Sequence, residues 1–217
     1  MKRSRTVRIS DAATRVQTRA LAAHRRSLTA QLRGEIGVPA APAGAATLVM
    51  LMGLPGVGKS YCARLLAERL GAAHVATDHL RSRLFIAPSY ADDENAAVFG
   101  IAEALVDELL ARGHVVILDA THLVARNRAP AERVARDRGA AVFHVLVTAD
   151  DGATRARLAS RARERAPGDH SDADERVYER MRERAIELPA EGYLEIRNGA
   201  TVADEVARVA AAIGSRR

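Results

Sequence analysis

The chain has 217 residues, of which 48% are hydrophobic and only 3% aromatic, so we expect a core of aliphatic side chains. No apolar run approaches the ~20 residues of a membrane span, and the basic start, residues 1–5, is not followed by the apolar stretch of a secretory signal. The single cysteine, Cys62, excludes an internal disulfide, so we expect a cytoplasmic protein. The net charge of +6 suits an anionic partner such as a nucleotide or nucleic acid, and equally a compositional bias toward arginine.

The first 46 residues are interpreted as a basic helical arm and linker. Ser10 and Asp11 are suitable N-caps for a helix that runs to about residue 36, with a loose apolar stripe and a basic side. The Gly- and Pro-containing stretch 37–46 then reads as a linker. Such an arm could contact nucleic acid, mediate a dimer or pack on the rest of the chain, and packing is slightly favoured.

Apolar segments and helical patterns alternate through residues 47–217, which we interpret as one domain. The run from His114 to Asp119 is the most apolar, which is typical of a central parallel strand buried on both faces. The alternation predicts a parallel three-layer α/β fold. The expected strands are 47–52, 73–76, 114–119, 141–147 and 193–196, and the expected helices are about 59–70, 79–86, 92–112, 127–138, 151–165, 172–187 and 202–213.

The clearest motif lies between the first strand and its helix. Residues 53–60 read Gly-Leu-Pro-Gly-Val-Gly-Lys-Ser, the G-x-x-x-x-G-K-S pattern of a phosphate-binding P-loop. Its glycines allow a tight turn whose N–H groups face an anion, and the N-terminus of the next helix adds its dipole. Lys59 is expected to reach the β- and γ-phosphates, and Ser60 to hold Mg²⁺. The predicted nucleotide-binding residues are Gly53, Pro55, Gly56, Val57, Gly58, Lys59, Ser60 and Tyr61.

Two carboxylates follow expected strands at the same edge of the sheet. Asp119 closes the most apolar strand, as a Walker B carboxylate does, so it is a second candidate ligand for Mg²⁺; alternatively it caps the next turn. Asp78 ends the second strand and is a candidate general base for an acceptor hydroxyl, or else the N-cap of the following helix. Arg81 lies one helical turn further on the same side, where it could hold an anionic group of the acceptor.

An arginine-rich helix follows the fourth strand. Arg157, Arg161 and Arg165 are four residues apart and therefore share one helix face. Guanidinium groups closing over the nucleotide would neutralise the transferring phosphoryl group, and the Pro167-Gly168 break suits a segment, about 151–175, that moves as a lid. The alternative is a solvated face of an arginine-rich protein.

Taken together, residues 47–187 resemble the P-loop kinases of the polynucleotide-kinase-like group, which includes the AAA_33 and zeta-toxin-related families. Asp78-x-x-Arg81 resembles the D-x-x-R motif of that group, in which the Asp is the general base and the Arg contacts an acceptor phosphate. The segment 118–122, followed by Arg126 and Arg128, resembles its strand-3 motif. Arg157 and Arg161 fall where its lid arginines fall, and Ser171-Asp172-Ala173 resembles its short motif after the lid.

The resemblance implies an adenylate-kinase-like core with sheet order 2-3-1-4-5 and an ATP- and Mg²⁺-dependent kinase. It implies four catalytic residues and four acceptor-binding residues. The preferred acceptor is a polynucleotide 5′-hydroxyl. The alternatives are a small-molecule kinase for a sugar or an antibiotic, a non-kinase NTPase or nucleotide-dependent binding module, and a toxin-type kinase with an antitoxin; the oligomeric state is left open. The catalytic set is Asp78, Lys59, Arg157 and Arg161, and the acceptor set is Asp78, Arg81, Thr121 and Arg128.

Overall fold

The computed structural model describes residues 21, 23–42, 44–86, 88–163, 174–183 and 186–216. Within them a five-stranded sheet has the spatial order β2-β3-β1-β4-β5, and each neighbouring pair is parallel. This is the order that the family resemblance implies. The strands are β1 (Thr47–Met52), β2 (Ala73–Ala76), β3 (Val115–Asp119), β4 (Ala141–Thr148) and β5 (Leu194–Arg197).

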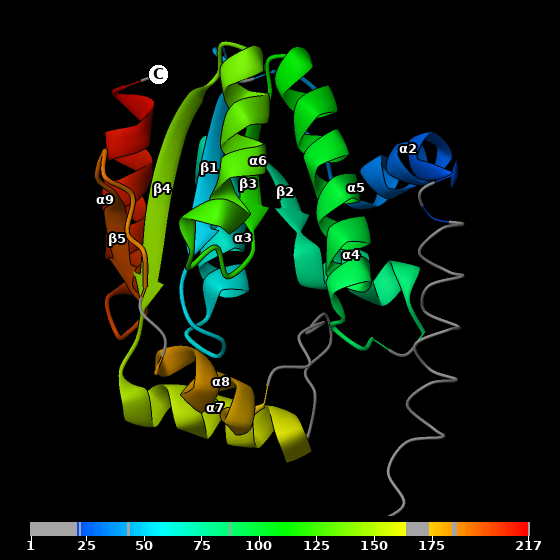
Figure 1. The fold of residues 1–217 in the computed structure, drawn as a ribbon. Coiled ribbons are helices and arrows are strands. Elements are labelled where there is room, and N and C mark those ends of the chain that lie inside the picture. The colour runs from blue at the N-terminus through cyan, green and yellow to red at the C-terminus, as the bar shows by residue number, and fades with distance from the viewer. Residues whose placement is uncertain are drawn as a thin grey trace, which may run out of the picture.

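Helices cover both faces of the sheet (Figure 1). One face carries α5 and α6, and the other carries α3 and α9. Helices α7 and α8 lie together across one end of the sheet. The helices are α2 (Arg25–Glu35), α3 (Lys59–Leu70), α4 (Thr77–Leu84), α5 (Asp92–Ala111), α6 (Ala125–Asp137), α7 (Asp151–Arg163), α8 (Glu175–Arg182) and α9 (Val202–Gly214).

Strand β1 divides the hydrophobic interior into two layers. All six of its residues are buried. Successive side chains of a strand point to opposite faces, so Leu48 and Met50 join the core under α5 and α6, whereas Val49 and Leu51 join the core under α3 and α9. A strand of a parallel sheet that is covered on both faces needs such a continuous apolar run, which explains why β1 and β3 were recognisable from the sequence.

Three helices within residues 47–217 begin at residues other than those predicted. Helix α4 begins at Thr77, so Asp78 lies inside its first turn and the interpretation of Asp78 as an N-cap is wrong. Helix α6 begins at residue 125 and not at 127. Helix α8 is shorter than the expected 172–187, and its N-cap is Asp174, which accepts a hydrogen bond from the backbone N–H of Val177 at 2.9 Å. The expected lid break at 167–168, the motif at 171–173 and Arg165 lie outside the described residues.

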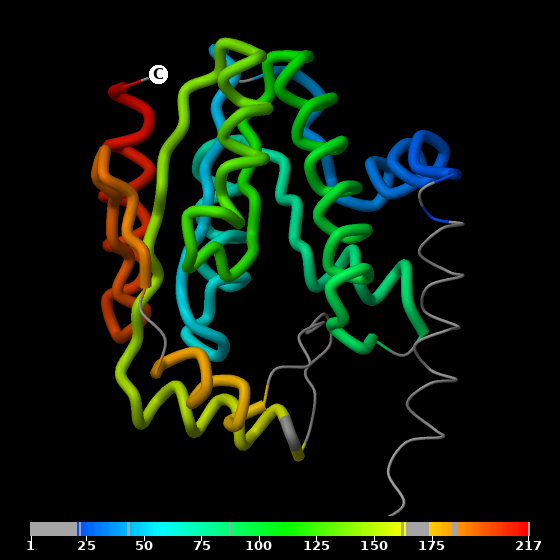
Figure 2. Tube along the Cα trace, in the orientation of Figure 1, coloured from blue at the N-terminus to red at the C-terminus, as the bar shows by residue number. Residues whose placement is uncertain are grey.

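Helix α2 packs along α5, on the side away from the sheet (Figure 2). Leu32 and Ile36 are buried in the same core as α5, and Glu35 forms an ion pair with Arg83 of α4 at 2.7 Å. Packing, the favoured alternative for this segment, is therefore what residues 25–36 show. Within the helix expected to run to about residue 36, the structure has a turn at His24, and α2 begins at Arg25. Among the described residues, no helix combines the length and the hydropathy that crossing a membrane requires.

Candidate active site

The P-loop connects the end of β1 to the start of α3. Gly58 is the N-cap of α3 and has a left-handed backbone, with φ 91° and ψ 31°, a conformation that favours glycine. The backbone N–H of Gly53 donates to the carbonyl of Thr121 at 3.1 Å, which ties the loop to the segment after β3. The Lys59 ammonium folds back and donates to the carbonyl of Leu54 at 2.9 Å. The motif therefore has the strand, loop and helix context that phosphate binding needs.

Lys59 is the electrostatic centre of the site. Its burial lowers the pKa of the ammonium, and the nearby carboxylates of Asp119 and Asp78 oppose that effect. The Arg161 guanidinium lowers the pKa of Lys59 further. The residues predicted for metal, acceptor and lid roles thus all influence the pKa of the phosphate-binding lysine, although the four side chains come from β3, α4, α7 and α3.

Asp119 ends β3 and is 4% exposed. Burial alone would raise its pKa, but the hydrogen bond and charge of His74, with the charge of Lys59 and a hydrogen bond from Ser60, hold the pKa of Asp119 below its usual value. The charged carboxylate and the Ser60 hydroxyl are oxygen ligands of the kind that Mg²⁺ prefers, so these residues fit that ion.

The contact of His74, a residue of β2, with Asp119 was not predicted from the sequence. Its Nε2 lies 3.2 Å from Oδ2 of Asp119. The available signal was the strand order, because β2 is the neighbour of β3 and both strands end at this edge.

Arg81 is bound within the protein. The residue is 4% exposed, and its guanidinium forms an ion pair with the fully buried Glu94 and donates to Oδ1 of Asn95 at 2.8 Å. The ring of Tyr90 covers it at 4.3 Å. Asp78, one turn earlier, is partly exposed. Sequence reasoning missed Glu94, which looked like an ordinary acidic residue in the first turn of a helix.

The loop after β3 is held by Arg128 and His122. Arg128 is 3% exposed and donates to the backbone carbonyl of His122 at 2.9 Å, so this predicted acceptor contact is also engaged inside the protein. His122 has a left-handed φ of 44°, and its Nδ1–H donates to the carbonyl of Leu51 at 3.0 Å. Burial lowers the pKa of His122 to about 4. Thr121 is partly exposed beside them.

Helix α7 lies directly against the P-loop. Nη1 of Arg157 is 3.4 Å from the carbonyl oxygen of Val57. A Cβ added to Gly56 would press on the side chains of Leu158 and Thr154, so only a glycine permits this approach. The helix predicted to act as a lid therefore packs against the P-loop in this structure.

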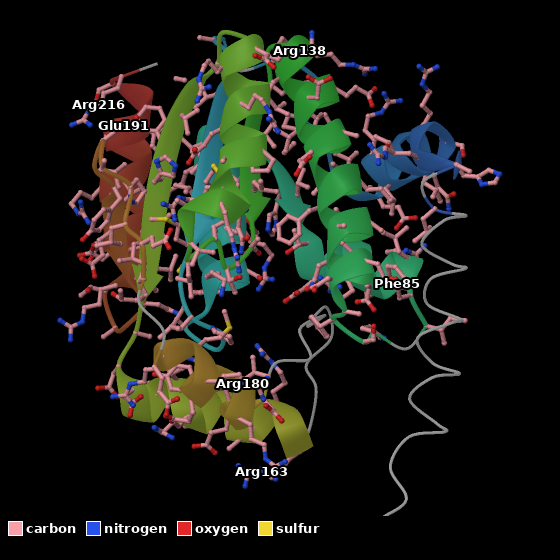
Figure 3. The ribbon with its side chains drawn as sticks, in the orientation of Figure 1. Phe85, Arg138, Arg163, Arg180, Glu191 and Arg216 are labelled. Atoms are coloured by element: carbon pink, nitrogen blue, oxygen red, sulfur yellow. The ribbon has the colours of Figure 1, made fainter. Side chains whose placement is uncertain are left out.

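A second face of α7 holds α8. Arg155 forms ion pairs with Asp151 of its own helix and with Glu175 and Glu179 of α8, and Tyr178 donates to Asp151 at 2.7 Å. Figure 3 shows Arg163 and Arg180 on this pair of helices at the end of the molecule opposite Arg138. Arg155 of the arginine-rich helix thus serves to join α7 to α8.

Asn198 contacts the P-loop from the end of β5, and sequence reasoning did not identify it. Its side-chain amide donates to the carbonyl of Val57 at 2.8 Å.

Two of the predicted nucleotide-binding residues differ in exposure: Pro55 is buried, and Tyr61 is 46% exposed. Cys62, next to Tyr61, is fully buried, and burial raises the pKa of its thiol to about 11.

Comparison with known proteins agrees with this architecture. The family model AAA_33, described as an AAA domain, matches residues 48–188. The uncharacterized protein Rv2004c of Mycobacterium tuberculosis H37Rv is 33% identical over 138 residues, which are 58% of this chain and 27% of that relative. The chain thus matches only about a quarter of the length of this curated relative.

Several solved structures share the fold. The APS kinase CysC of Mycobacterium tuberculosis, in complex with AMPPNP and APS, has a TM-score of 0.58 and 22% identity and covers 79% of this chain and 99% of its own. Kti12 of Chaetomium thermophilum, in complex with ADP-AlF3, has a TM-score of 0.61 and 20% identity over 77% and 97%. A gluconokinase from Sinorhizobium meliloti 1021 has a TM-score of 0.54 and 17% identity over 80% and 98%. Because the family model spans well over half of the sequence, the chain belongs to the AAA_33 family of AAA domains.

Proposed function

We propose that the chain is an ATP- and Mg²⁺-dependent phosphotransferase that moves the γ-phosphate of ATP to a hydroxyl of a small molecule. The observation that carries the proposal is that two carboxylates lie at the same edge of the sheet near Lys59: Asp119 ends β3, and Asp78 lies in the first turn of α4, directly after the neighbouring strand β2. A nucleotide hydrolase needs the P-loop, its lysine and one metal-binding carboxylate. The second carboxylate, contributed by α4, supports an acceptor side of the same site.

The donor half rests on the P-loop and its neighbours. Backbone N–H groups of the loop would bind the phosphates, and Lys59 would reach the β- and γ-phosphates. Ser60 and Asp119 would hold Mg²⁺, which supplies charge neutralisation on the phosphate oxygens. Arg157 and Arg161, on the helix that lies over the loop, would stabilise the transferring phosphoryl group.

The acceptor half rests on Asp78. Its carboxylate would orient the acceptor hydroxyl and accept the hydroxyl proton while the new O–P bond forms. The bond between the γ-phosphorus and the β–γ bridging oxygen breaks in the same step, and ADP leaves. Since phosphoryl transfer depends on positioning more than on covalent chemistry, one oriented carboxylate is sufficient for this side.

A small-molecule acceptor is favoured over a polynucleotide end. The polynucleotide expectation depended on Arg81 as a contact for acceptor phosphate, but its charge is neutralised by Glu94 and its guanidinium is covered by Tyr90. Arg128 is likewise engaged by the carbonyl of His122. Two similar structures are named as an APS kinase and a gluconokinase, and the first contains AMPPNP and APS. Neither the site nor these comparisons support a nucleic-acid partner.

A transfer assay with labelled nucleotide tests this function. The full chain is incubated with γ-labelled ATP and Mg²⁺ beside sugars, sugar acids, nucleosides and aminoglycosides, and beside a 5′-hydroxyl oligonucleotide. We expect label on at least one small alcohol and none on the oligonucleotide. A labelled oligonucleotide would overturn the acceptor class. Steady phosphate release with no labelled acceptor in any arm would instead identify a nucleotide hydrolase.

A further inference from the structure

The P-loop is held from outside by the end of β5. Asn198 is 7% exposed, and its side-chain amide donates to the carbonyl oxygen of Val57 at 2.8 Å. The backbone N–H of Asn198 donates to the carbonyl of Thr148 at 2.7 Å, which fixes the residue to β4. A buried amide anchored at both its backbone and its side chain is a rigid support for the loop.

The bond to Val57 controls the neighbouring N–H group. The carbonyl of Val57 and the N–H of Gly58 belong to one peptide unit, and the described residues contain no cis peptide. In a trans peptide the C=O and the N–H point to opposite sides. While Asn198 holds the carbonyl on the β5 side, the Gly58 N–H is turned away from β5, as P-loop amides must be to face a phosphate.

The packing at Gly58 is close. A Cβ on this residue would overlap the amide nitrogen of Asn198, and the φ of 91° also disfavours any side chain there. The glycine of the motif thus serves two purposes, because it permits both the turn and the approach of Asn198. The Val57 carbonyl also accepts a hydrogen bond from Nη1 of Arg157 at 3.4 Å, which is longer and weaker than the bond from Asn198 and comes from a helix predicted to move.

We propose that Asn198 is a positioning residue of the nucleotide site, whose amide orients the Val57–Gly58 peptide so that the Gly58 N–H faces the nucleotide phosphates. This inference rests on the proposed function only in that the P-loop binds nucleotide phosphate. Asn198 follows β5 and lies outside the P-loop motif, 141 residues from Val57 in the sequence. The proposal therefore gives the segment after β5 a role in the nucleotide site.

Binding measurements on the full chain test the role of Asn198. Isothermal titration calorimetry compares the affinity for Mg-ADP and for Mg-tripolyphosphate in the wild type, Asn198→Ala, the isosteric Asn198→Asp and Asn127→Ala. Loss of one oriented hydrogen bond is expected to weaken both ligands roughly tenfold in Asn198→Ala. Asn198→Asp is expected to lose more, because a carboxylate cannot donate and repels the phosphates. Asn127, exposed on α6, is the matched control and should leave both affinities unchanged.

A second readout separates orientation from general loss of structure. In the wild type, ADP should move the amide proton resonance of Gly58 downfield, and this shift should be much smaller in Asn198→Ala. Should Asn198→Ala fail to fold, the isosteric Asn198→Asp gives the same comparison. A wild type that does not bind ADP contradicts the proposed function itself. A wild type that binds ADP, with variants that match its affinity and its Gly58 shift, overturns the role of Asn198 alone.

Discussion

The buried carboxylate of Glu94 neutralises the buried guanidinium of Arg81, and this pair joins α4 to the first turn of α5. Glu94 also accepts hydrogen bonds from the backbone N–H and the hydroxyl of Ser89, at 2.7 and 2.8 Å. One carboxylate therefore fixes the connection between the two helices. Since α4 carries Asp78, the position of the candidate base depends on this network.

Removing the charge of Glu94 should be costly. Glu94→Gln leaves the Arg81 guanidinium buried without its counterion, so we expect a loss of about 3–5 kcal/mol in the free energy of unfolding, measured with urea. The control is Asp107→Asn, which removes the charge of Asp107 from its exposed ion pair with Arg138. Arg138 lies at the end of the molecule opposite α7 and α8 (Figure 3), and this substitution should change stability far less. Equal effects of the two substitutions would contradict a structural role for the buried pair.

The acid sensitivity of the protein should depend on His122. The folded protein keeps this ring neutral down to about pH 4, whereas an unfolded histidine takes up a proton near its ordinary value of 6.5. Between these values the unfolded chain binds the extra proton, so stability falls as the pH falls. The contribution is about 3 kcal/mol over this window. This contribution should be absent in His122→Asn, because asparagine has no titrating side chain. Asparagine also tolerates the left-handed backbone at this position, so the variant should keep the fold.

Urea unfolding of the wild type and of His122→Asn between pH 7 and 4.5 measures this contribution. The exposed His24→Asn variant is the control and should keep the wild-type slope of stability against pH. An unchanged slope in His122→Asn would show that the ring is not the group responsible.

The sequence predicts the parts of this fold that local patterns encode. The five strands and the P-loop follow from apolar runs, turn residues and a motif of contiguous residues, whereas the sheet order is implied by the family resemblance. These features were confirmed with shifts of a few residues at helix ends, where local signals are weakest. The location of Asp119 at a strand tip was similarly accessible, since a strand ending in a carboxylate is itself a local pattern.

The partners of the polar side chains could not be predicted. Arg81 looks like a free cation in the sequence because its partners, Glu94 and Asn95, are set by how α4 packs against α5. His74 lies 45 residues from Asp119, and Asn198 lies 141 residues from Val57. Only the strand order brings these pairs together, and a motif search that reads contiguous residues does not detect them.

Cys62 should be unreactive in the native protein. The N-terminus of α3 would favour a thiolate, but burial is the larger effect and raises the pKa of the thiol to about 11. We therefore expect slow modification by a thiol reagent at pH 8 and rapid modification in urea. Because Cys62 is the single cysteine, the reaction reports one site. Fast stoichiometric labelling of the native protein at pH 8 would contradict the buried position.

Helix α2 should be part of the folded core. Leu32 is 3% exposed against α5, so Leu32→Ala is expected to cost about 2–5 kcal/mol of unfolding free energy. Gln31→Ala, at an exposed neighbouring position, is the control and should be nearly neutral. Thermal and urea unfolding give the comparison. Wild-type stability in Leu32→Ala would mean that α2 does not contribute to the core in solution.

The most direct test of the account is the rate of γ-phosphate transfer by Asp78→Asn, measured with the small alcohol that the wild type labels and alongside the affinity for ADP. The amide has the shape of the carboxylate but cannot accept the hydroxyl proton, so transfer should fall by roughly 10²–10⁴-fold while ADP affinity stays close to that of the wild type. Transfer at the wild-type rate by Asp78→Asn would contradict the account.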